Sequence, residues 1–140
     1  MKYRSFGDVF ILRFDMGEEI VSSLLEFCEK ENIKAGTVSA IGAAKDIEIA
    51  VFDVSTKKYS RTELRENHEI LSLKGLIGFV EGKSHAHLHI VVAGHDFSAK
   101  GGHLDKAVAS PTCEMVVRKL DGELHRKQDE ETGLKLLEFQ

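Results

Sequence analysis

The sequence predicts an α+β domain in which a mostly antiparallel β-sheet packs against one main α-helix. One stretch near the N-terminus has apolar residues at helical spacing, and nearly everything after it alternates apolar and polar residues between turn signals. The chain has 140 residues, enough for one domain with a core and too few for two comfortable ones. We therefore expect a single domain over residues 1–140, with a core at about 5–120 and a charged C-terminal segment at 121–140.

The helix is predicted over residues 18–31. Asp15 is a candidate cap, Glu18 and Glu19 suit the positive end of the helix dipole, and Asn32 is the expected stop. The apolar residues at helical spacing are Ile20, Val21, Leu24, Leu25 and Cys28. No other segment shows this spacing as clearly, so one helix is expected.

The remaining segments read as strands. The first alternating segment, Val9–Phe14, precedes the helix. The later candidates are 35–41, 47–54, 59–64, 69–75, 76–80, 86–92, 113–120 and 134–139. The segment 35–41 leads into Gly42–Ala44, and turns are expected at 53–58, at Gly101–Gly102 and at Asp121–Gly122. Many consecutive strands after one helix favour an antiparallel sheet.

Composition describes an ordinary globular protein, with 42% hydrophobic and 30% charged residues. The net charge of −4 argues against a domain that grips nucleic acid through its phosphates. We expect no signal peptide and no membrane span, and hence a cytoplasmic protein without membrane contacts. Cys28 and Cys113 lack a CxxC partner and are expected to be reduced, buried thiols, with a disulfide as the minor alternative.

The segment 84–104 contains five of the seven histidines: His85, His87, His89, His95 and His103. Side chains alternate along a strand, so His85, His87 and His89 should share one face of the segment 86–92. The opposite face would carry apolar residues. A core strand with imidazoles along its other face is the strongest functional signal in the sequence.

A metal site is the interpretation that this pattern favours. His87 and His89 point the same way on a strand, and His103 follows two glycines that let the backbone approach closely. Three histidines with an open fourth position are typical of a site for zinc or another divalent transition metal. The alternative is a group of surface or interface histidines that binds no metal.

Two other families share part of this pattern. His85–His87–His89 fits the His-φ-His-φ-His-φ-φ signature of histidine-triad nucleotide hydrolases, but the Gly-Gln-(Ser/Thr)-Val element that precedes that triad is missing. A cupin requires a glutamate four or five residues after the second histidine, and the sequence has none there. The histidine-triad hydrolase stays a weaker alternative.

A set of short motifs in a fixed order resembles the PPC domain, the plants-and-prokaryotes conserved domain also found in AT-hook nuclear proteins of plants. The matching segments are Arg13–Glu18, Gly36–Ala43, Glu69–Gly75, His87–His89, Gly101–Leu104 and Thr112–Val116. The resemblance implies one helix on an antiparallel sheet, assembly as a homotrimer, and a metal site, usually zinc, at His87, His89 and His103. His85 then falls where many members have proline.

The same resemblance implies DNA binding by family association. The Arg-Gly-Arg-Pro AT-hook that binds DNA in the plant proteins is, however, absent from the sequence. The partner-contact segment of the plant proteins is matched only in its second half, Glu69–Leu71 of residues 66–71. The resemblance therefore favours a stand-alone prokaryotic type whose partner is itself, with DNA a partner by family association alone.

A metal-dependent hydrolase and a small-molecule-binding protein are the remaining alternatives. A hydrolase needs a general base near the metal, for which Asp96, Glu114 or His85 are the candidates. Arg13 matches a family position and could bind a ligand, or could form a salt bridge with a carboxylate such as Glu18 or Glu114. No reaction is predicted from the sequence.

Overall fold

A computed structural model of the chain describes residues 1–139 and confirms the α+β class, with one short helix and nine strands in that range. The first elements are β1 (Lys2–Phe6), β2 (Val9–Phe14), α1 (Ile20–Lys30), β3 (Gly36–Asp53) and β4 (Lys58–Leu64). They are followed by β5 (His68–Val80), β6 (Lys83–Ala93), β7 (Ala99–Lys119), β8 (His125–Gln128) and β9 (Lys135–Glu138). α1 has 11 residues, and no helix within residues 1–139 is long and apolar enough to cross a membrane.

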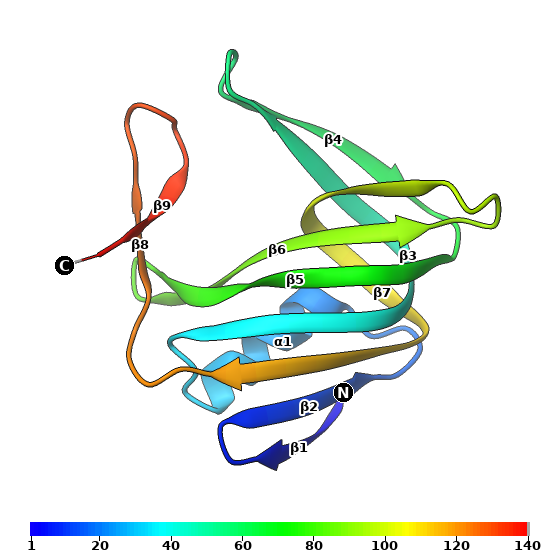
Figure 1. Cartoon of the computed structure of the whole chain (residues 1–140), viewed down its shortest axis with the longest axis horizontal. Helices are drawn as coiled ribbons and strands as arrows, with labels where there is room; N and C mark the ends of the chain where they lie inside the picture. The colour runs from blue at the N-terminus through cyan, green and yellow to red at the C-terminus, as the bar shows by residue number, and fades with distance from the viewer. Residues whose placement is uncertain (140) are drawn as a thin grey trace.

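All strands belong to one sheet with the order β1-β2-β7-β3-β5-β8-β9, to which β4 adds beside β3 and β6 beside β5 and β7. The pairings of β3 with β5, β5 with β6, β6 with β7 and β7 with β3 close a circuit. The pairs are antiparallel, apart from a parallel contact between Phe79 and His125. Figure 1 shows α1 behind the sheet and the hairpins β3–β4 and β8–β9 projecting from it.

The helix begins later than predicted, and its cap is Glu19, not Asp15. The Glu19 carboxylate accepts hydrogen bonds from the backbone N–H groups of Val21 at 3.0 Å and Ser22 at 2.6 Å. The same carboxylate accepts a bond from the N–H of Ala107 on β7 at 3.1 Å. A glutamate is long enough to reach both the helix end and a strand, which explains why it replaces the short cap expected from sequence.

One face of α1 forms the centre of the core. Phe27 is only 2% exposed, and its ring lies edge-on to Phe10 at 5.3 Å and to Tyr3 at 4.9 Å between centroids. Such edge-to-face aromatic pairs stabilise beyond the area that they bury. Cys28 and Cys113 are both free and buried, as expected, and burial raises the pKa of each thiol to about 12.

Three predicted breaks in the sheet are wrong, because strands continue through them. β3 passes through Gly42–Ala44, and bulges there let it stay paired with β5 and β7. β5 is one strand where two were predicted. β7 starts at Ala99, so Gly101–Gly102 lie inside a strand and form no turn.

Two strands were not predicted. β1 has a single hydrophobic residue on the side that faces the core and pairs as an edge strand with β2, so its alternation is weak. β8 lies in the charged segment, which was expected to be exposed. It pairs with β9, and β9 confirms the predicted last strand at 134–139.

Candidate metal centre

β6 presents histidines and apolar residues on opposite faces, as the alternation predicted. Leu88 and Ile90 are 0% and 1% exposed and belong to the core. His87 and His89 lie on the other face, where His87 is half-buried and His89 is exposed. The apolar face therefore fixes the strand while the imidazoles stay accessible.

His103 reaches the pair from β7, where it lies directly opposite His89 in the antiparallel register. A Cβ atom at Gly101 would come within 2.6 Å of the Ile90 carbonyl oxygen, and one at Gly102 within 2.6 Å of the Ala50 carbonyl oxygen. The two glycines thus allow β7 to lie close to β6 on one side and β3 on the other. Close approach was the predicted role of these glycines, although the turn was not found.

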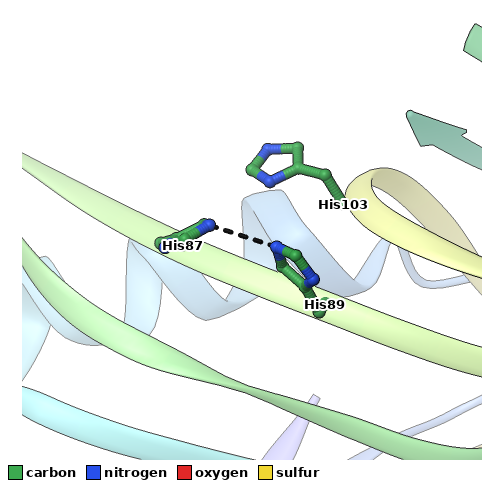
Figure 2. A group of neighbouring side chains, drawn as sticks. All are labelled: His87, His89 and His103. Carbon is green, nitrogen blue, oxygen red and sulfur yellow. Dashed lines mark hydrogen bonds between the residues drawn. The ribbon is translucent and has the colours of Figure 1, made fainter. Parts of the chain in front are cut away.

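The three imidazoles come together on one side of β6 and β7 (Figure 2). Their ring centroids are 5.1 Å apart for His87 and His89, 5.3 Å for His87 and His103, and 5.7 Å for His89 and His103. One nitrogen from each lies within 4.8 Å of the others. The Nε2 atoms of His87 and His89 are 3.2 Å apart.

This nitrogen separation fits a metal ion. Two nitrogens at about 2.0–2.1 Å from a tetrahedral Zn²⁺ are roughly 3.3 Å apart, close to the observed value. Three nitrogen ligands also leave the fourth tetrahedral position open. The donor set suits zinc and its neighbours among the divalent transition metals.

Burial and nearby charges disfavour the protonated, positively charged form of two of the three rings. Burial lowers the pKa of His87 to about 4, and the positive charge of Arg126 acts in the same direction. Burial also lowers the pKa of His103, partly opposed by the Asp105 carboxylate. Both imidazoles are therefore neutral near pH 7, and a neutral imidazole has a free lone pair for a metal.

The hairpin β3–β4 contacts the cluster on the side of His103. The Tyr59 ring lies 5.7 Å from the His103 ring, between centroids. Asp105 Oδ1 is 3.7 Å from His103 Nε2, while Arg61 Nε donates to Asp105 Oδ2 at 3.0 Å. Carboxylates that accept a hydrogen bond from a ligand histidine orient its ring in many metal sites; Asp105 lies beside the ring of His103 but at 3.7 Å makes no such bond. Asp105 was missed because the sequence places it in no motif.

The hairpin β8–β9 contacts the cluster on the side of His87. Arg126 Nη2 lies 3.2 Å from His87 Nδ1, and Arg126 Nη1 donates to the Lys135 carbonyl oxygen at 2.9 Å. Sequence reasoning missed this arginine, because it lies 39 positions from His87 in a segment of mixed charge. Only the pairing of β8 with β5 and β9 brings it to the site.

The other candidate residues lie outside the three-histidine group. His85 is half-buried on the same strand, and burial and then Arg126 lower its pKa. Asp96 instead accepts hydrogen bonds from the N–H and hydroxyl of Ser98 in its own loop. Glu114 is exposed on β7, opposite Arg13.

Arg13 does not pair with Glu18 or Glu114. Its guanidinium contacts Asp15, with both Nε and Nη2 at 3.0 Å from Oδ1. Glu18 instead binds the N-terminal amine and accepts from the N–H of Asp15. Arg13 is thus paired with Asp15, two positions away in the sequence, and not with either carboxylate that the sequence suggested.

The model of the Plants and Prokaryotes Conserved (PCC) domain matches residues 1–121. Among solved structures, a candidate DNA-binding protein from Bacteroides thetaiotaomicron is 32% identical, with a TM-score of 0.95 and coverage of 99% of this chain and 96% of the other. A metal-containing protein from Archaeoglobus fulgidus is 39% identical, with a TM-score of 0.89, and the match covers 99% of this chain and 100% of that protein. A plant- and prokaryote-conserved protein from Pyrococcus horikoshii is 28% identical, with a TM-score of 0.89, and the match covers 99% of this chain and 96% of that protein. The curated proteins give no match.

Proposed function

The chain belongs to the Plants and Prokaryotes Conserved domain family, and on that premise we propose that it is a metal-binding protein. The ligands would be His87, His89 and His103, and the ion a divalent transition metal, with zinc the best fit to three imidazoles. The observation that carries the proposal is the convergence of three imidazoles from two strands. The metal-containing protein from Archaeoglobus fulgidus, 39% identical to this chain, supports it.

A zinc ion held in this way would act as a Lewis acid at its open position. Other side chains of the protein would hold the ligand His103 in position. Arg61 fixes Asp105, and Asp105 lies beside the ring of His103. The Tyr59 ring also lies 5.7 Å from the His103 ring, between centroids, and limits the space in which His103 can turn.

The test is metal analysis of protein purified without a histidine tag. We expect about one zinc ion per chain in the wild type and a loss of most of it in His87→Ala, because two remaining imidazoles form an incomplete site. His95→Ala is the matched control, since His95 is an exposed loop histidine outside the group. Metal-free wild-type protein that takes up no zinc on dialysis would refute the proposal.

We also propose that the protein assembles as a homotrimer, as the family resemblance implies. Apolar side chains exposed on the face of the sheet opposite α1 support self-association, among them Ile11, Ile41 and Val116. Ile11 and Val116 lie directly opposite each other on β2 and β7. Light scattering should give three times the mass of one chain, and a monomer at micromolar concentration would contradict the prediction.

Other functions have less support. DNA binding, which is named for the relative from Bacteroides thetaiotaomicron, has less support here, because residues 1–140 carry a net charge of −4 and contain no Arg-Gly-Arg-Pro motif. A hydrolase would need a general base at the metal. Of the three candidates, Asp96 is bound by Ser98, Glu114 lies opposite Arg13 on β2, and His85 lies outside the three-histidine group. Asp105 is close to His103, but its carboxylate is engaged by Arg61. Metal binding is therefore proposed without a reaction.

A further inference from the structure

Arg126 is a partly buried cation beside the three-histidine group that has no carboxylate partner. Within residues 1–139, no aspartate or glutamate lies within 4.0 Å of its guanidinium nitrogens. Two of its five N–H groups are directed to His87 and to the Lys135 carbonyl. Buried charges in proteins are normally paired, and Arg126 is half-buried. An arginine in this position is therefore available to an anion from outside the chain.

The surroundings of the group are cationic, although the chain as a whole carries a net charge of −4. Lys74 on β5 is the strand partner of His89, and the alternation of side chains places both on the same face of the sheet. Lys135 is a neighbour of Arg126, whose Nη1 donates to the Lys135 carbonyl oxygen. The Asp105 carboxylate is already paired with Arg61, so the local field favours a negatively charged ligand.

Metal binding would also free the arginine. A guanidinium only donates hydrogen bonds, so the contact with Arg126 requires a lone pair on His87 Nδ1 and places the ring proton on Nε2. A metal bound at Nε2 requires the opposite tautomer, with the proton on Nδ1. Arg126 then loses its acceptor at His87 and needs another one nearby.

We propose that this site binds a small oxoanion, a carboxylate or a phosphoryl group, between the open position of the metal and the guanidinium of Arg126. The inference rests on the proposed metal function and adds a ligand class to it. The planar fork of an arginine matches the paired oxygens of both groups. The hairpin β8–β9 thus supplies a ligand-binding residue from beyond residues 1–121, the part of the chain that the family model matches.

The experiment uses the full chain, stripped of metal and reconstituted with Co²⁺, whose visible absorption reports the coordination of the ion. Inorganic phosphate and acetate are titrated separately at pH 7 and constant ionic strength. We expect at least one anion to change the spectrum, with a dissociation constant on the order of 10- to 100-fold higher in Arg126→Gln. Lys127→Gln is the matched control, because Lys127 is an exposed cation on the same strand that pairs with Glu138.

Each outcome has a distinct meaning. A weaker anion response in Arg126→Gln with an unchanged response in Lys127→Gln supports the inference, and the stronger of the two anions identifies the group. Equal affinities in the wild type and Arg126→Gln, or no response to either anion, would overturn it while the metal proposal stands. Wild-type protein that gives no cobalt spectrum would overturn the metal proposal, and the anion site with it. An altered oligomeric state in Arg126→Gln with unchanged anion affinity would assign Arg126 to a subunit contact instead.

Discussion

Replacing Gly75 by alanine should destabilise the protein by about 3 kcal/mol or more and disturb the three-histidine group. A Cβ atom at Gly75 would come within 2.1 Å of the His87 carbonyl oxygen and 2.6 Å of Leu88 Cδ2. Overpacking a core costs about 1–3 kcal/mol where side chains can move. Here the obstacle is the backbone of β6 at a ligand residue, so relief requires a shift of the strand itself. Urea unfolding of metal-free protein, at equal protein concentration, measures the loss.

Gly94→Ala is the matched control for this substitution. A Cβ atom at Gly94 would meet Asp96 Oδ1 at 3.4 Å and the His68 ring at 3.5 Å, both in side chains that can move. We expect a change within about 0.5 kcal/mol. A Gly75→Ala protein as stable as Gly94→Ala, with its full metal content, would show that β6 does not need this close approach.

The fold was predictable where the pattern is local. Helical spacing identified α1, and alternation identified β2 and β6, because burial of one face directly determines which residues are apolar. The continuity of β3 and β7 was not predictable. Their bulges at Gly42 and beyond depend on partners elsewhere in the chain, and a glycine in sequence looks the same in a turn and in a bulge.

The grouping of the three histidines was predictable to the same extent. His87 and His89 follow from alternation on one strand, and His103 from two glycines that permit close packing. Asp105 and Arg126 were missed. Asp105 gains its place from a contact with Arg61 on β4, and Arg126 from the hairpin β8–β9, so both depend on tertiary structure that no local pattern encodes.

Leu88→Ala and His89→Ala should have opposite effects, although the two residues are adjacent on β6. Leu88 is 0% exposed in the core, and its truncation should cost about 2–5 kcal/mol in the free energy of unfolding. His89 is exposed, so His89→Ala should change the stability of metal-free protein by no more than about 0.5 kcal/mol. Urea unfolding in the presence of a chelator measures both.

The zinc content of the two variants should show the opposite order, with little loss in Leu88→Ala and a large loss in His89→Ala. Leu88→Ala should keep about one zinc ion per folded chain, because the three imidazoles remain on their face of β6 and β7. His89→Ala should lose most of its zinc, and with it the stabilisation that zinc gives to wild-type protein through binding the folded state. A Leu88→Ala protein that folds but binds no zinc would mean that core packing under β6 sets the ligand geometry. A His89→Ala protein that retains zinc would remove this residue from the ligand set.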